Sequence, residues 1–348
     1  MDGGAEKSIL HFMDACRTLG IGIELATASE MPRLPHEFSV YPLVLEGWTR
    51  SSKSKSFRHA VSSWAHTSNC DLYQSNEWAI DVDILRLGDG LHSHWLQQLD
   101  SDKPGIRSVI RKMSPFHNDR LRSEREALTS QSLKAIICNS ELVLKQLKNS
   151  YPAASEKAVV IYNPAIVDAS DQSIDSDSSE YFWLGFAGSG WYRKGLDIAI
   201  SALAHLPADV RLKVAGRDSE WQRYSKLAHE IGVSDRVVFE GVVDDMRIFY
   251  RSIDALVHPA RYDPCPNVAI EAISNDLPVI VSAHTGMADF DGESGLRVLP
   301  PLHSAVSVAD AAIEILQGRI GLPENDFKQI FSFEKFCTSL DGLYKGLL

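Results

Sequence analysis

The chain has 348 residues, of which 44% are hydrophobic and 23% are charged, and its formal net charge is -11. This length suits two domains with sizeable cores, and the composition is that of a globular protein rather than a disordered or fibrous one. The acidic balance argues against general nucleic-acid binding, which favours a basic surface.

The cysteines are odd in number and far apart, and no two have CxxC spacing: Cys16, Cys70, Cys138, Cys265 and Cys337. This pattern argues against a disulfide framework or a structural zinc site and favours a reducing compartment. No apolar run approaches the roughly 18–20 residues that span a bilayer, and the N-terminus lacks the apolar core of a signal peptide. We therefore expect a cytoplasmic protein.

The first half contains short apolar segments that predict strands of a parallel sheet. They lie at residues 21–27, 40–45, 72–76, 84–88, 134–138 and 158–162.

An acidic, serine-rich stretch at 168–180 is almost free of apolar residues, so it cannot contribute to a core. We interpret it as a linker or an exposed loop between two halves. The domain boundaries that we expect are 1–165, a linker at 166–180, a second domain at 181–318, and C-terminal helices at 319–348.

The second half alternates regularly between apolar runs and helical patterns. Strands are predicted at 183–188, 210–216, 237–241, 255–260 and 278–283, and helices at about 194–205, 219–231, 244–252, 267–275 and 331–348. Alternation of this kind predicts βαβ units and a doubly wound parallel sheet.

Residues 188–195 follow a predicted strand and open a helix. The small residues Gly188 and Gly190 allow close approach of a ligand to the backbone, and free N–H groups at a helix start favour anions. A dinucleotide fingerprint is not matched, because Arg193 stands at the third glycine position. Arg193 and Lys194 instead suit phosphate oxygens. The alternative is a solvated helix start with two surface cations.

Asp263 precedes a predicted helix that contains Glu271. Eight helical residues cover about 12 Å, more than the roughly 5–9.5 Å between the two carboxylates of a glycosidase. The two acids therefore suit opposite ends of an extended ligand, with Glu271 on ribose hydroxyls and Asp263 facing a sugar. Asn267, Val268 and the following amides could bind a diphosphate. The alternative is a turn cap at Asp263 and an exposed helix acid at Glu271.

Together with residues 214–216, 239–241 and 256–260, these motifs resemble the donor-binding domain of retaining GT-B glycosyltransferases of family 4. The resemblance implies an α/β fold with two doubly wound Rossmann-like domains facing across a cleft. It also implies transfer of a hexose from a nucleotide diphosphate sugar, UDP-glucose or similar, to a hydroxyl of a glycan or glycolipid. Asp263 departs from the family pattern, in which a longer Glu usually stands at this position.

The first half supports the same resemblance. Gly3 and Gly4 resemble the family's glycine loop, whose amides meet the donor, and a disordered terminus that contains glycines is the alternative. Residues 86–95 resemble the active-site loop of lipopolysaccharide-core glycosyltransferases, which implies that Asp89 faces the acceptor or the reacting sugar. His92 and His94 are then acceptor-side candidates, although a solvated helix start is the alternative for both.

In two-lobed enzymes of this kind the C-terminal tail often packs on the first lobe. Family members also carry a strand before the glycine loop, whereas Met1 and Asp2 alone precede Gly3 here. We therefore expect the first domain to lack a central strand. Two other functions stay open: a GT-B sugar-nucleotide epimerase, and a non-catalytic protein that retains the donor fold.

Two further segments have less specific patterns. Asp81 and Asp83 have the form of a metal-binding Asp-x-Asp of another glycosyltransferase class, but we expect no metal and no cofactor. Residues 103–125 hold seven basic residues against two acids. This stretch could contact an anionic membrane face, and an ordinary solvated helical face is the alternative.

Overall fold

The computed structural model describes residues 4–28, 38–102, 105, 108, 113–165 and 180–348. The chain folds into two compact units. The first comprises Ala5–Ile161 and Phe336–Leu348, and the second comprises Tyr162–Lys335. Gly3 and most of the predicted linker lie outside the described residues. No helix among these residues is long and apolar enough to cross a membrane.

The second unit is built on a parallel sheet with the strand order β12-β11-β10-β7-β8-β9. The strands are β7 (Phe182–Ala187), β8 (Val210–Ala215), β9 (Val237–Gly241), β10 (Ala255–His258), β11 (Val279–Ser282) and β12 (Leu296–Leu299). The first five confirm the predicted strands, and β12 was not predicted. Every neighbouring pair is parallel, which confirms the doubly wound prediction.

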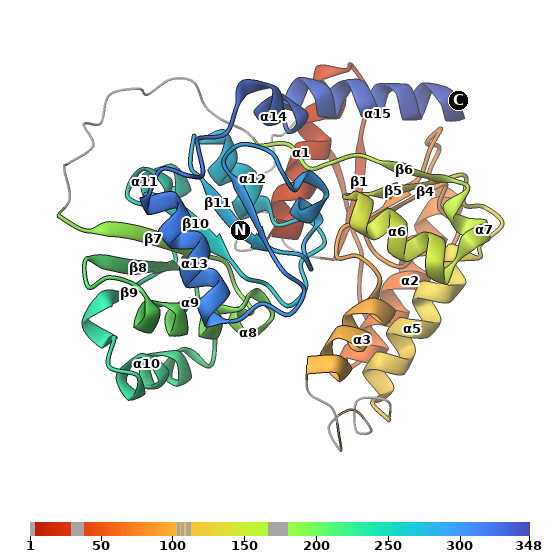
Figure 1. Ribbon diagram of the computed structural model, residues 1–348. Helices are drawn as coiled ribbons and strands as arrows, with labels where there is room; N and C mark the ends of the chain where they lie inside the picture. The colour runs from red at the N-terminus through yellow and green to blue at the C-terminus, as the bar shows by residue number, and fades with distance from the viewer. Residues whose placement is uncertain (1–3, 29–37, 103–104, 106–107, 109–112, 166–179) are drawn as a thin grey trace. The chain divides into compact units, whose positions relative to one another are not determined.

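Helices cover both faces of this sheet (Figure 1). One face packs against α9 (Leu196–Ala202), α10 (Trp221–Glu230) and α13 (Ala305–Leu316). The other packs against α11 (Met246–Arg251), α12 (Asn267–Ser274) and α14 (Asn325–Ile330). The remaining short helices are α8 (Trp191–Lys194), η1 (Leu203–His205), η2 (Ser234–Arg236) and η3 (Gly286–Phe290).

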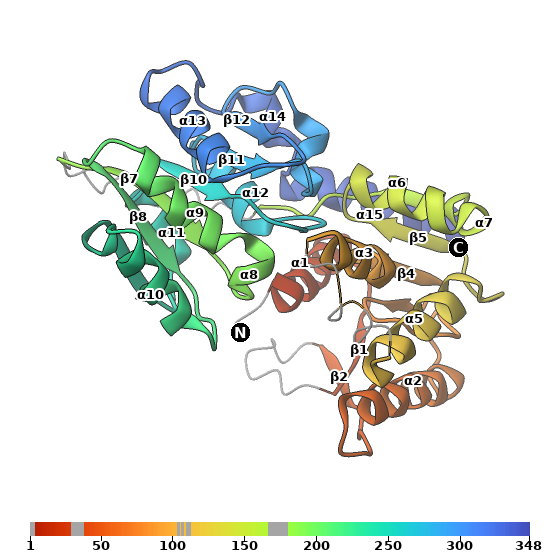
Figure 2. The same cartoon turned by 60° about the horizontal axis from the view of Figure 1, so that its bottom comes forward.

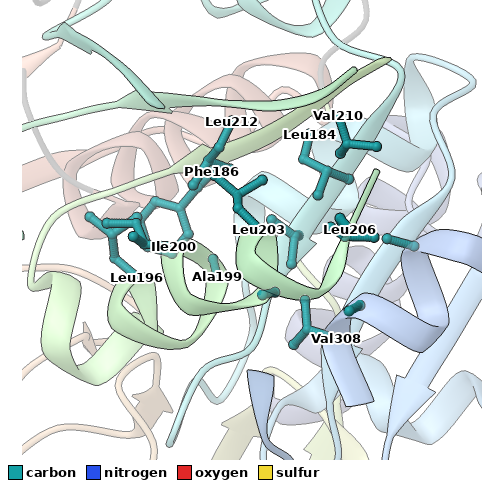
Figure 3. Close-up of a cluster of buried hydrophobic side chains, with 14 of the residues drawn as sticks. Leu184, Phe186, Leu196, Ala199, Ile200, Leu203, Leu206, Val210, Leu212 and Val308 are labelled. Carbon is teal, nitrogen blue, oxygen red and sulfur yellow. The ribbon is translucent and has the colours of Figure 1, made fainter. Parts of the chain in front are cut away.

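Helix α9 shows why the predicted pattern folds this way. Its apolar residues Leu196, Ala199, Ile200 and, just beyond it, Leu203 recur at the spacing of one helical face. Figure 3 shows these side chains directed toward the strand residues of the sheet, with Phe186 among them. Full burial of a leucine, isoleucine or phenylalanine side chain stabilises the folded state by about 1.5–3 kcal/mol.

The first unit contains a parallel sheet with the order β3-β4-β5-β6 and, separately, the parallel pair β1-β2. The six strands confirm those predicted for this half: β1 (Glu24–Thr27), β2 (Ser39–Pro42), β3 (Gln74–Ser75), β4 (Ile84–Leu87), β5 (Ala135–Cys138) and β6 (Ala158–Val160). Among the described residues, the helices of this unit are α1 (Gly4–Thr18), α2 (Arg50–Thr67), α3 (His92–Asp102), α5 (Pro115–Leu128), α6 (Glu141–Ser150) and α7 (Pro152–Ser155).

The last helix, α15 (Phe333–Leu347), confirms the helix predicted at the C-terminus. The Phe336 and Phe12 rings meet edge to face, with centroids 5.0 Å apart. Near the end of α15, the Tyr344 hydroxyl donates a hydrogen bond to Gln74 Oε1 at 2.9 Å. These interactions attach the C-terminal helix to the first unit.

Candidate active site

The strand order of the second unit defines a point at which the chain reverses direction across the sheet. From β7 the chain proceeds to β8 and β9 on one side, and it then builds β10, β11 and β12 on the other. In open parallel sheets, ligands bind at the carboxyl ends of the strands at such a point. The loops that leave β7 and β10 there carry the two predicted motifs, 188–195 and 263–271.

Glycines allow the two loops to approach each other. Gly195 has a φ of +81°, and a Cβ at this position would lie 2.1 Å from the carbonyl oxygen of Pro259. A residue with a side chain is therefore disfavoured at position 195 for two reasons: its Cβ would clash with Pro259, and the positive φ favours glycine. Beside Gly195, the Arg261 amide donates a hydrogen bond to the Arg193 carbonyl at 2.8 Å. The loop after β7 is thus held directly against the loop after β10.

A buried ion pair crosses the same point. The Lys194 ammonium contacts Asp263 Oδ2, and both side chains are largely shielded from solvent. His258, at the end of β10, lies with its Nε2 2.8 Å from the same carboxylate oxygen and is fully buried. The sequence predicted Lys194 and Asp263 as site residues, and the structure shows that they contact each other.

The charge states follow from these interactions. Burial alone would raise the pKa of Asp263, but Lys194, the hydrogen bond from His258 and the nearby Arg193 hold this pKa well below its usual range. Burial lowers the pKa of His258 despite the opposing effect of Asp263. A neutral imidazole next to a carboxylate must donate from Nε2, because the carboxylate only accepts. The cluster at neutral pH is therefore an ammonium, a carboxylate and a neutral imidazole.

Arg193 adds a second cation beside this pair. Arg193 as a whole is half-buried, and its guanidinium forms no hydrogen bond or ion pair with another described residue, so it can bind an anion. The neighbouring backbone is fixed by Arg261, which makes a two-pronged ion pair with Asp197 at 2.8 and 2.7 Å and lies over the Tyr192 ring.

Trp191 anchors the start of the same turn. Its amide donates to Asp218 Oδ2 at 2.9 Å, and its indole Nε1 donates to the Gly188 carbonyl at 2.9 Å. The ring itself is buried. Gly188 and Gly190 both have positive φ values, of 132° and 68°, as expected for a loop that turns sharply before a helix. Residues 188–195 therefore form a sharp turn that leads into the short helix α8, and the buried Trp191 at the start of this helix argues against a fully solvated helix start.

The start of α12 lies next in the chain. Its first hydrogen bond runs from the Ala269 amide to the Pro266 carbonyl, so the amides of Asn267 and Val268 precede it and have no partner within the helix. The Asn267 side chain accepts a hydrogen bond from Asn163 at 2.7 Å. These are the groups that the sequence predicted for a diphosphate.

Glu271 is a half-buried acid rather than an exposed one. Its Oε2 accepts a hydrogen bond from the Tyr250 hydroxyl at 2.8 Å. Burial, with Glu271 adding to the effect, raises the pKa of Tyr250 well above its ordinary value, so this hydroxyl remains a donor. The hydrogen bond orients one oxygen of Glu271, and its assignment to ribose stays a prediction.

In the first unit, Asp89 lies in the turn after β4 and is exposed. The turn is fixed by Asn139, whose Nδ2 donates to the Gly88 carbonyl at 2.7 Å. Gly4, from the predicted glycine loop, is the first residue of α1. The proposed contacts of Asp89 and Gly4 with substrates stay predictions.

The two histidines of α3 are not a solvated helix start, which corrects that alternative. His92 stacks on His117, with ring centroids 5.2 Å apart, and its Nε2 lies 3.1 Å from His117 Nδ1. Burial, together with His117 and Arg120, lowers the pKa of His92 to about 4. His94 lies 3.1 Å from Ser150 Oγ, and burial lowers its pKa as well.

The Asp-x-Asp motif immediately precedes β4, and its carboxylates contact protein groups. Asp81 accepts a hydrogen bond from Ser62 at 2.6 Å, and Asp83 pairs with Lys134 at 2.9 Å. Within the described part of the chain, no three His, Cys, Asp or Glu side chains are grouped as a metal would require.

Four of the seven basic residues in the predicted segment 103–125 lie outside the described residues. Its described part includes the first three turns of α5, in which Arg120 pairs with Glu77 at 3.1 Å. The whole helix carries three basic and three acidic residues.

Family models match both halves of the chain. The model for glycosyltransferase family 4 matches residues 2–168, and the model for group 1 glycosyl transferases matches residues 182–318. The chain belongs to the family 4 glycosyltransferases. The sequence resemblance is therefore confirmed at the level of the family.

Two curated relatives match part of this family 4 chain. One is the lipopolysaccharide core biosynthesis glycosyltransferase LpsE of Rhizobium meliloti, 39% identical over 108 residues, and the other is the lipopolysaccharide glucosyltransferase WaaG of Escherichia coli, 35% identical over 120 residues. The matches cover 30% and 33% of this chain. In each case the chain spans 32% of the length of the relative.

Solved structures resemble the chain over almost its whole length. A crystal structure of WaaG covers 98% of this chain and 92% of its own, with a TM-score of 0.78 and 19% identity. The structure of Anabaena HepE in complex with UDP-glucose covers 99% and 97%, with a TM-score of 0.74 and 18% identity. These likenesses show that this family 4 chain has the GT-B fold.

Proposed function

We propose that the protein is a retaining hexosyltransferase. It moves a sugar from a nucleotide diphosphate sugar, UDP-glucose or a similar donor, to a hydroxyl of a glycan or glycolipid, with lipopolysaccharide core as the first acceptor to test. The observation that carries this proposal is the group formed by Lys194, Asp263 and His258 at the reversal point of the second sheet, with Arg193 beside it.

The charges of this group suit the reaction. Cleavage of the anomeric bond leaves negative charge on the diphosphate and develops positive charge on the sugar. Arg193, Lys194 and the amides at the start of α12 can stabilise the diphosphate without a metal. Asp263 stays ionised at neutral pH because its pKa is held low, so it can face the positive sugar.

The stereochemical outcome is proposed from the family resemblance. The departing phosphate accepts the proton of the acceptor hydroxyl on the face that it leaves, and the new bond forms on that face. The anomeric configuration is thereby retained, and no cofactor enters the reaction.

The choice of donor and acceptor rests on relatives. HepE has been solved with UDP-glucose, and both curated relatives above are named for lipopolysaccharide. The five cysteines are free thiols, which supports the proposed cytoplasmic location. A glycolipid acceptor would place the protein at the inner face of the membrane.

Product analysis tests the proposal. The protein is incubated with UDP-glucose, UDP-galactose or GDP-mannose and with truncated lipopolysaccharide core, and the products are identified by NMR. We expect an acceptor-dependent glycoside with the anomeric configuration of the donor, and Arg193→Ala should reduce its formation by about two orders of magnitude.

Three other results would overturn the proposal. If the sugar or the sugar nucleotide is epimerised when no acceptor is present, the protein is an epimerase. Inversion of configuration excludes the retaining mechanism. Nucleotide binding with neither transfer nor donor hydrolysis indicates a non-catalytic protein.

A further inference from the structure

The segment between β2 and α2 exposes several large apolar side chains. Val44 is 81% exposed and Trp48 is fully exposed, while Val40 and Tyr41 on β2 are about half exposed. The backbone here is held in place, because Leu43 is buried against Val61 and other residues of one apolar cluster. Figure 2 shows β2 next to α2, and the segment connects the end of β2 to the start of α2. The exposed side chains therefore project from a fixed surface.

Local helix chemistry does not account for Trp48. The side chain and backbone of Thr49 and Ser52 bond reciprocally in a capping box that starts α2, so Trp48 immediately precedes the cap. An apolar residue at this position commonly packs on the residue five positions later. That residue here is Lys53, which offers no apolar partner. Trp48 thus remains in water although its indole would be stabilised by an apolar or interfacial environment.

The charges around Trp48 are predominantly positive. Residues 38–67 contain Arg50, Lys53, Lys55 and Arg58 against the single acid Glu46. Arg58 is paired with Asp119 at 3.4 Å. The other three cations are exposed and form no ion pair with any described residue. On a chain with a net charge of -11, this is a local reversal of charge.

Helix stability does not explain these cations either. The first turn of α2 has no acidic residue, although acids are favoured there and cations disfavoured by the helix dipole. Arg50 and Lys53 both lie near this end. Their positions therefore suit an external anionic partner better than they suit the isolated helix.

We propose that this surface, composed of Val40, Tyr41, Val44, Trp48, Arg50, Lys53 and Lys55, docks on an anionic lipid bilayer. Tryptophan and aliphatic side chains bury their apolar parts at the membrane interface, while lysine and arginine meet anionic headgroups. An acidic protein or a nucleic acid would use the cations but would not require the exposed Trp48 and Val44. The inference goes beyond the proposed glycosyl transfer, and its test requires no activity.

The surface differs from the basic segment 103–125 considered from the sequence. Four of the seven basic residues of that segment lie outside the described residues. Its described helix, α5, carries equal numbers of basic and acidic residues, whereas α2 carries basic residues and no acid. At the proposed docking surface, positive charge and exposed apolar side chains occur together.

Vesicle flotation tests the docking surface. The full chain is mixed with vesicles of phosphatidylcholine alone or with phosphatidylglycerol. We expect binding to the anionic vesicles only. The double variant Lys53→Gln/Lys55→Gln should bind about thirty-fold more weakly, and Trp48→Ser roughly tenfold more weakly.

Matched controls separate this surface from general effects. Lys145→Gln/Lys148→Gln removes the same charge from exposed positions of α6 and should leave vesicle binding within about twofold, since headgroup attraction acts only near the bilayer surface. Trp221→Ser removes a half-exposed tryptophan of the second unit and should also have little effect. Thermal melting confirms that each variant is folded.

The possible results decide the proposal. Loss of vesicle binding in both test variants, with both controls unaffected, supports it. Absence of binding to anionic vesicles overturns it. Binding that depends on the lysines but not on Trp48, and that a DNA oligonucleotide or polyglutamate abolishes, indicates a soluble polyanion as the partner and also overturns it.

Discussion

The two units differ in how they hold their candidate site residues. In the second unit, Lys194 and His258 both contact the Asp263 carboxylate at the carboxyl ends of one continuous sheet. In the first unit, Asp89 is exposed, and the strands form two separate sheets within the described residues. Contacts within the folded second unit thus hold in place the charged groups that we propose for donor binding. The exposed Asp89 is not held in this way, so a bound acceptor could still change its orientation.

The largest effect should come from Lys194→Ala. Loss of one preorganised charge contact costs about two to three decades of turnover. The substitution also leaves Asp263 buried with His258 as its remaining side-chain partner, so we expect roughly 3 kcal/mol less stability. Turnover in a glucosyl-transfer assay and urea unfolding measure the two effects.

A double variant separates these effects. Lys194→Ala/Asp263→Asn removes the unpaired charge and should recover much of the stability but none of the turnover. Turnover within a few-fold of wild type in Lys194→Ala would contradict the role of Lys194.

A glycine pair tests the contact between the two loops. Gly195→Ala places a Cβ 2.1 Å from the Pro259 carbonyl oxygen, whereas Gly190→Ala, also at a positive φ, meets nothing within 4 Å. We expect Gly190→Ala to cost about 1–2 kcal/mol from backbone strain alone, and Gly195→Ala to cost several kcal/mol more by urea unfolding. If the two variants lost equal stability, the close contact between the two loops would make no measurable contribution to the free energy of unfolding.

His258 variants test the buried hydrogen bond to Asp263. His258→Phe keeps an aromatic ring next to Phe186 but removes the donor, which should cost about 1–3 kcal/mol and lower turnover. His258→Gln can still donate and should restore part of both. If the Phe and Gln variants were equally active and equally stable, the hydrogen bond would have no positioning role.

The first unit should show a smaller, pH-dependent effect. The pKa of His92 is about 4 in the folded protein because of burial, His117 and Arg120, against about 6.5 in an unfolded chain. The unfolded state therefore binds more protons below pH 6.5, and stability falls as the pH decreases from about 6.5 to about 4.

Urea unfolding at pH 7 and pH 5 measures this dependence. His92→Gln should reduce the loss of stability between the two values, while replacement of the exposed His59 by Gln should not. An unchanged pH dependence in His92→Gln would show that His92 does not contribute to it.

Much of the fold was predictable because buried parallel strands are short, apolar and separated by helices. All eleven predicted strands form, from residues 24–27 to 279–282. Strand β12 was missed because Arg297 interrupts its short apolar run and is exposed.

The site was only partly predictable. Arg193, Lys194 and Asp263 stand out in the sequence because charged residues next to strand ends and glycines are informative. His258 and the Arg261–Asp197 pair were missed, because their roles depend on partners that only the fold brings together. A histidine at the end of an apolar strand, five residues before a candidate acid, was the available signal for His258.

Calorimetric titration of the wild-type protein with UDP and UMP tests whether the reversal point of the second sheet binds a nucleotide diphosphate, on which the proposed function depends. We expect UDP to bind at least about tenfold more tightly than UMP, Arg193→Ala to abolish this preference, and Glu271→Ala to weaken both ligands. Equal affinity for UDP and UMP, or an unchanged preference in Arg193→Ala, would show that the diphosphate is not bound there.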